Sequence, residues 1–154
     1  MFSLVINFTN LLLAALLVGA MFGVWLVLNP TGMDAGSYVA LQQQGIRRLN
    51  KPMPILGAAT ILFTIVAAVA ASGDSRRFGL LIAGTVCFIS AGLITRFLNQ
   101  PINAIVITWN SNTPPAAWEN LRDAWWRWHR LRMLASAVGF CLLLVAALQK
   151  SWQL

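Results

Sequence analysis

Charged and metal-binding side chains are scarce in this sequence. Only 10% of its 154 residues are charged, and it contains four Asp and Glu residues, one His and two Cys. A single histidine excludes a bis-histidine haem. So few acids exclude the usual carboxylate-bridged di-iron bundle, which needs several inward Glu and His residues. No Cys-x-x-Cys pair, glycine-rich phosphate loop or serine triad pattern is visible either, so any chemistry must depend on few residues.

The two cysteines, Cys87 and Cys141, both lie inside apolar runs. We expect each to behave as a small hydrophobic residue, and the alternative is a disulfide that ties two spans together. No Lys or Arg precedes Arg47. Because a cleavable signal peptide needs a basic start, we expect the first apolar run to be retained as a span.

The net charge of +7 comes from 11 Lys and Arg against four acids. In a soluble protein this balance would suggest a nucleic-acid partner. Here the basic residues flank apolar runs and no nucleic-acid motif appears, so membrane orientation and anionic lipid explain them better. We expect no nucleic-acid partner.

Apolar residues dominate the chain, at 58%, and the mean hydropathy is +0.71. Apolar runs of about 18 residues or more are typical of membrane spans. We predict one all-α domain over residues 1–154, an integral membrane four-helix bundle embedded in lipid. Its spans cover about 5–28, 55–71, 78–98 and 125–148, and interfacial segments cover 29–54 and 99–124.

Small residues recur at every fourth position of the first span, at Ala15, Gly19 and Gly23. Such a ladder lets another helix approach closely. It either packs inside the protein's own bundle or forms a homo-oligomer. After this span, Asp34 is expected to cap a short helix that Pro52 and Pro54 end.

The third span ends in polar residues: Arg96, Asn99 and Asn103 would share one helix face, but Pro101 is expected to break or kink the helix. Freed carbonyls and two amides beside an arginine would form a polar pocket. The alternative is a plain helix end, with Arg96 extending its guanidinium to the headgroups.

A tryptophan-rich stretch, residues 118–132, contains the only histidine and leads into the last span. If the stretch is helical, Trp118, Arg122, Trp125, His129 and Arg132 form one stripe. The uncharged part of the last span has only 16 residues, which reaches ~24 Å against a hydrocarbon core of ~30 Å. We therefore predict that this stretch is continuous with the fourth span, and that Thr113-Pro114-Pro115 starts the helix.

Histidine can transfer a proton near neutral pH, which makes His129 the candidate catalytic base. Arginines could stabilise an oxyanion, and aromatic faces such as Trp125 could hold a flat apolar substrate. The alternative is an interfacial aromatic belt with basic anchors. No metal or cofactor is predicted, although a single-His metal site helped by methionine stays open. The methionines in question are Met33, Met53 and Met133.

Basic residues also predict an orientation. Eight of them lie in the two long connections, against Arg76, Arg77 and Lys150 on the other side. The positive-inside rule then places both long connections in the cytoplasm and both termini outside, in what we expect to be a bacterial inner membrane.

Two motifs resemble a known family of short four-span membrane proteins that includes the fungal anthrone oxygenases. They are Asn-x-Pro-x-Asn at residues 99–103 and Arg-x-x-Trp-x-x-x-His-x-x-Arg at residues 122–132. The resemblance implies oxygen insertion into a lipid-soluble aromatic, anthrone-like substrate without a bound cofactor. It implies that His129 transfers a proton. The polar pocket would comprise Asn99, Asn103, Arg122 and Arg132, and we add Arg96 and Trp125 from their positions. The alternative function is a non-enzymatic membrane subunit or assembly protein.

Overall fold

The computed structural model describes residues 2–30 and 32–149, and almost all of these are helical. The elements are α1 (Phe2–Val27), α2 (Ala35–Leu49), α3 (Pro52–Ala70), α4 (Ser75–Ile94), the π-helical turn η1 (Thr95–Asn99), α5 (Gln100–Val106) and α6 (Trp118–Gln149). Four helical stretches are long and apolar enough to cross a membrane: Ser3–Val27, Pro52–Ala70, Ser75–Val106 and Trp118–Gln149. The predicted all-α bundle, with the tryptophan-rich stretch continuous with the last span, is confirmed.

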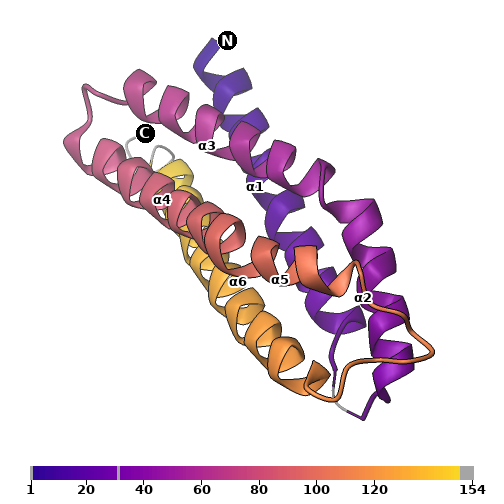
Figure 1. Cartoon of the computed structure of the whole chain (residues 1–154). Coiled ribbons are helices and arrows are strands. Elements are labelled where there is room, and N and C mark those ends of the chain that lie inside the picture. The colour runs from indigo at the N-terminus through magenta and orange to yellow at the C-terminus, as the bar shows by residue number, and fades with distance from the viewer. Residues whose placement is uncertain (1, 31, 150–154) are drawn as a thin grey trace.

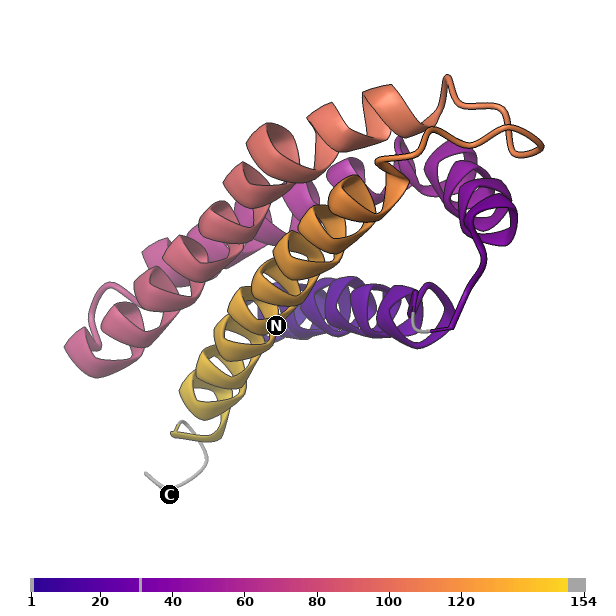
Figure 2. The same ribbon diagram turned by 60° about the horizontal axis from the view of Figure 1, so that its bottom comes forward.

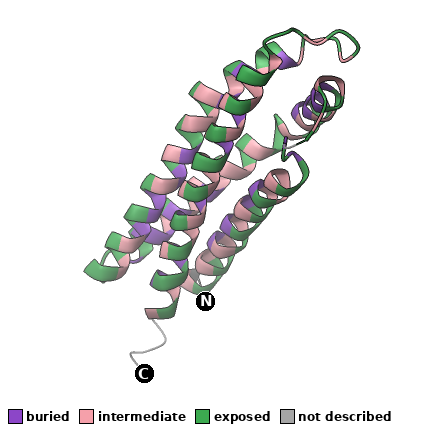
Figure 3. Cartoon of the chain, turned by 90° about the horizontal axis from the view of Figure 1, so that it is seen from below, coloured by how far each residue is buried: buried purple, intermediate pink, exposed green. Residues whose placement is uncertain are grey.

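The four long helices form an elongated bundle in which α4 packs along α6 and α3 packs along both α1 and α4 (Figures 1 and 2). Both ends of the described chain and the α3–α4 turn lie at one end of the bundle. The α2 helix and the loop before α6 lie at the other. Buried residues face the inside, whereas the outer surfaces of the long helices are exposed (Figure 3). Many large apolar side chains lie on those outer surfaces, which is typical of an integral membrane protein.

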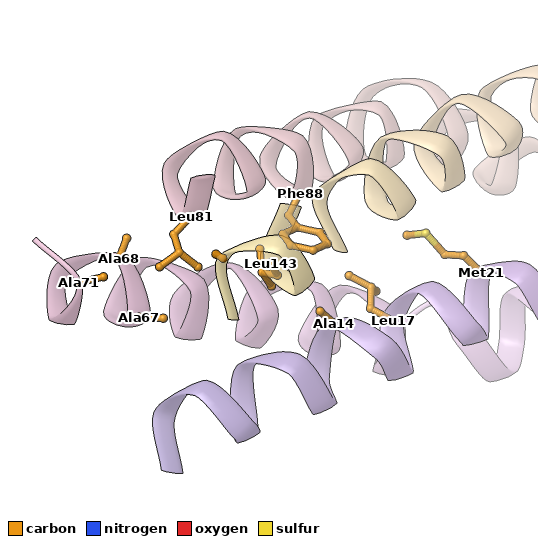
Figure 4. Close-up of a cluster of buried hydrophobic side chains, with 10 residues drawn as sticks. Ala14, Leu17, Met21, Ala67, Ala68, Ala71, Leu81, Phe88 and Leu143 are labelled. Carbon is orange, nitrogen blue, oxygen red and sulfur yellow. The ribbon is translucent and has the colours of Figure 1, made fainter. Parts of the chain in front are cut away.

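One cluster of buried side chains from α1, α3, α4 and α6 forms the core at the end of the bundle that holds the termini (Figure 4). There α4 and α6 approach closely at two glycines. A Cβ added to Gly139 would lie 3.1 Å from the Cβ of Cys87 and 3.2 Å from the carbonyl oxygen of Gly84. Small residues therefore permit the tightest helix contact. Cys87 and Cys141 are both free thiols, so the alternative of a disulfide between them is wrong.

The small-residue ladder of α1 does not contribute to this packing. Ala15 and Gly19 are exposed, and a Cβ added to Gly19 or Gly23 would meet nothing within 4 Å. The inner face of α1 is formed instead by Ala14, Leu17 and Met21. The alternative that the ladder packs inside the bundle is therefore wrong, and a homo-oligomer through it stays a prediction.

Pro101 does not break the third span, so the break that the sequence predicted there is wrong, although the helix is locally irregular just before the proline. The helix widens to a π-helical turn over Thr95–Asn99, and the backbone N–H of Gln100 donates to the carbonyl of Thr95. This turn accommodates the proline ring and its missing N–H just before α5 begins. The helix continues to Val106, so the third span is longer than the predicted 78–98.

The α2 helix closes the end of the bundle opposite the termini. Asp34 caps it as predicted, because its Oδ1 accepts from the backbone N–H of Ser37 at 3.0 Å. Gln43 ties α2 to the end of α5, where its Nε2 donates to the carbonyl oxygens of Val106 at 3.0 Å and Trp109 at 2.7 Å. The α6 helix begins at Trp118. The expectation that Thr113-Pro114-Pro115 forms its first turn is therefore wrong, because these residues belong to the preceding loop.

Candidate functional site

A cavity of about 310 Å³ lies between the core and α2. Its wall is mostly apolar, and it includes Leu17, Met21 and Phe88, which also belong to the core cluster of Figure 4. Small-molecule sites commonly measure about 300–1,000 Å³ and combine an apolar wall with a few polar groups. This cavity therefore has room for one compact molecule.

His129 contributes to the wall of the cavity and is fully buried. Its Nδ1 accepts hydrogen bonds from Arg132, at 3.2 Å from Nε and 3.0 Å from Nη2. Because a nitrogen that accepts cannot carry a hydrogen, Nε2 is the protonated nitrogen, and it lies 3.2 Å from the carbonyl oxygen of Met21. The network thus describes a neutral imidazole whose one lone pair faces a guanidinium.

Arg132 has only neutral partners within the described part of the chain. Besides His129, its Nη1 donates to Oγ1 of Thr95 at 3.1 Å, and the Thr95 hydroxyl donates in turn to the carbonyl of Ala91 at 2.8 Å. The ion pairs found among residues 2–30 and 32–149 both belong to Arg122, with Glu119 and Asp123. A guanidinium beside an apolar cavity with no carboxylate is a strong attractor for an anion.

Trp125 is held from two sides by the asparagines of the first motif. Its indole Nε1 donates to Oδ1 of Asn103 at 2.8 Å, and its backbone carbonyl accepts from Nδ2 of Asn99 at 3.1 Å. The indole stacks on the imidazole of His129, with ring centroids 5.1 Å apart and an interplanar angle of 6°. The ring of Trp126 also stacks on His129, at 5.8 Å. The imidazole is therefore fixed by stacking as well as by hydrogen bonds.

Most of the predicted site residues meet at the cavity. Those that line it are Arg96, Asn103, Trp125, His129 and Arg132. Asn99 is buried behind the wall, where it positions Trp125. Of the three methionines considered for a metal site, only Met53 lines the cavity. Among the residues that the structure describes, no three His, Cys, Asp or Glu side chains come together.

Arg122 does not line the cavity, although it lies on the same stripe of α6. Its guanidinium pairs with Glu119 at 3.5 Å and Asp123 at 2.8 Å. It also stacks over the ring of Trp118 at 4.6 Å. Trp118 packs in turn against Tyr38 of α2, with ring centroids 5.4 Å apart, and burial raises the pKa of the Tyr38 phenol. This cluster fastens α2 to α6.

Three groups of the site were not anticipated from the sequence. They are the hydroxyl of Thr95, the backbone carbonyl of Met21 and the amide of Gln42, which lines the cavity from α2. A backbone carbonyl leaves no sequence signal, and a threonine in an apolar span ordinarily bonds its own helix. Gln42 lies in a run of three glutamines, and the period of the α2 helix would have been needed to select it.

Comparison with protein families matches this sequence to the anthrone oxygenase family over residues 43–142, well over half of the chain. The chain belongs to the anthrone oxygenase family. Comparisons with curated proteins and with solved structures gave no match. The part that matches the family contains η1, α5 and the first three-quarters of α6, and hence both motifs of the site. Met21 and Gln42 lie before it.

Proposed function

We propose that this anthrone oxygenase family member binds a flat, lipid-soluble aromatic ketone in its cavity and oxygenates the benzylic carbon opposite the ketone. The observation that carries the proposal is the contact between His129 and Arg132 at the wall of an apolar cavity. A base and a cation at the same place suit a reaction in which a carbon loses a proton and an oxygen anion then forms on it.

His129 needs a free lone pair before it can act as a base. In the structure Nδ1 accepts from Arg132. We infer that binding of the substrate displaces the guanidinium from Nδ1 toward its other partner, Oγ1 of Thr95, which leaves Nδ1 free to take the benzylic proton. The Met21 carbonyl holds the opposite nitrogen, Nε2, so the imidazole keeps its orientation.

The reaction that follows consumes one oxygen molecule. The benzylic carbanion, stabilised through the rings by the ketone, transfers electrons to molecular oxygen and forms a carbon–oxygen bond. The peroxide anion, which Arg132 stabilises, takes back the proton from His129. Loss of the second benzylic proton with cleavage of the oxygen–oxygen bond releases water and leaves a quinone carbonyl. The substrate CH₂ and one O₂ thus become C=O and one H₂O.

The network also supports a reaction without a metal at His129. Nε2 is engaged with a backbone carbonyl and Nδ1 with a guanidinium. A metal cation at Nδ1 would lie beside the positive charge of Arg132, and two cations in a low-dielectric site repel each other strongly.

We further propose that the four long helices span a bacterial inner membrane. Both long connections would face the cytoplasm, so that the α2 end of the cavity lies near that surface.

The test compares His129→Gln with the matched control Arg130→Gln, whose side chain is exposed on the same helix. Protein in detergent or nanodiscs is supplied with a hydroxylated anthrone in air. Quinone formation is followed by absorbance and oxygen uptake by an electrode. His129→Gln should lower the rate by about 10²–10⁴-fold, as for loss of a general base, and Arg130→Gln should not. Turnover by His129→Gln at the wild-type rate, or a wild-type rate equal to protein-free oxidation, would refute the proposal.

A further inference from the structure

One residue of the cavity wall contains a buried polar atom that makes no hydrogen bond in the fold. Gln42 is 2% exposed, lines the cavity, and its Oε1 has no hydrogen-bond partner among the described residues. The neighbouring Gln43 has its amide fully engaged with α5 and Arg47, so α2 is already fastened without Gln42. Buried side-chain oxygens without partners are rare and costly, and each calls for an explanation.

The charged and titratable groups of the cavity come from different elements. His129 and Arg132 belong to α6, and Arg96 belongs to η1. The other polar residues of the wall are Asn50, Thr95, Gln100 and Asn103. Arg96 and Arg132 offer donors and positive charge, and the neutral His129 accepts from Arg132 at Nδ1, whereas the free atom of Gln42 is an acceptor. The cavity thus combines cationic donors from α6 and η1 with a neutral acceptor from α2.

We propose that Gln42 is a specificity-determining residue, whose side-chain oxygen accepts a hydrogen bond from a hydroxyl group on the ligand. The inference rests on the proposed function, since it assigns an additional contact in the same cavity. An aromatic ligand oriented with its reacting carbon at His129 then carries its hydroxyl toward α2. The buried acceptor discriminates against ligands without that hydroxyl, because those ligands leave it unpaired.

The experiment combines a ligand change with a protein change. The ligands are a monohydroxyanthraquinone and the unsubstituted anthraquinone. Binding is measured by quenching of tryptophan fluorescence. Wild-type protein should bind the hydroxy compound about threefold to tenfold more tightly, as expected for one net hydrogen bond. Gln42→Met, similar in shape but without the amide, should bind both compounds equally. The matched control Gln44→Met, exposed on the same helix, should keep the wild-type preference.

Stability without ligand separates this role from a structural one. Removal of a buried oxygen that has no partner should raise the melting temperature of Gln42→Met, by about 2–4 °C per kcal/mol for a chain of this size. A glutamine that supports the fold would lower the melting temperature instead. If Gln42→Met does not fold, Gln42→Leu provides the same comparison, and failure of both variants to fold overturns the inference. Equal preference in wild type and Gln42→Met overturns it as well. If neither compound binds to wild-type protein, the proposed function fails and takes this inference with it.

Discussion

Replacement of Arg132 by Met tests whether the cavity is built for an anion. Arg132→Met keeps most of the side-chain volume and removes the charge, whose partners in the described chain are the neutral His129 and Thr95. A unit charge about 4 Å from an anion is worth about 4 kcal/mol at an effective dielectric constant of about 20. That figure is an upper bound, because the guanidinium must give up its present hydrogen bonds. A net charged hydrogen bond of about 1.5–3 kcal/mol is the better figure.

This free energy corresponds to about one to two pH units in the ionisation of a bound phenol. An anthraquinone with one hydroxyl beside each carbonyl places one hydroxyl at the Arg132 end of the cavity. It changes colour when that hydroxyl ionises, so its absorbance can be titrated in the bound state. In wild-type protein the bound compound should ionise at a pH lower by that amount than in Arg132→Met. Arg132→Lys should retain part of the effect, and the exposed Arg130→Met should retain all of it. Identical titrations in wild type and Arg132→Met would show that the guanidinium does not face the ligand.

The remaining predictions concern packing. Gly139→Ala places a Cβ 3.2 Å from the carbonyl oxygen of Gly84 and should lower the free energy of unfolding by about 1–3 kcal/mol. Gly92→Ala, inside α4 with nothing within 4 Å, should instead raise it by about 0.5–1 kcal/mol in the same denaturation assay, because alanine is the better helix former. Gln43→Met removes the donor to the Trp109 carbonyl and should cost about 1–3 kcal/mol. In this variant, hydrogen exchange of the α2 and α5 backbone amides should accelerate. Unchanged protection would mean that the hydrogen bonds of Gln43 are not needed to hold α2 against α5.

The spans could be predicted because hydropathy and length alone determine them, whereas helix interruptions depend on tertiary contacts. The rule that proline breaks a helix holds for an unsupported helix. Here Asn99 is anchored to the carbonyl of Trp125 in α6, and a π-helical turn at Thr95–Asn99 accommodates Pro101. Nothing local to the sequence reveals that support. For a similar reason, the sequence could not predict whether the small-residue ladder of α1 faces the inside or the outside of the bundle, since small residues suit both faces equally well.

The sequence predicted correctly which face of α6 carries the stripe, but not how much of that stripe lines the cavity. Arg122, Trp125, His129 and Arg132 do share a face, yet Arg122 lies seven residues from His129, about 10 Å along the axis. The cavity ends before that distance because Tyr38 of α2 packs against Trp118 there. A helical period gives the angle of a side chain around one helix. The length of a site depends on where other helices close it.

The small number of acidic residues, rather than the motif, could have predicted that Arg132 has no carboxylate partner inside the bundle. The chain has four acids, and each has a role near a helix start: Asp34 and Asp74 cap α2 and α4, and Glu119 and Asp123 pair with Arg122. None was left to neutralise an arginine inside the bundle. Since a guanidinium is always charged and costly to bury alone, a fold that buries one without a carboxylate must offset that cost elsewhere. The hydrogen bonds to His129 and Thr95 offset part of that cost in the fold. In the proposed reaction, an anion that forms in the cavity would be stabilised by the charge that these neutral partners leave uncompensated.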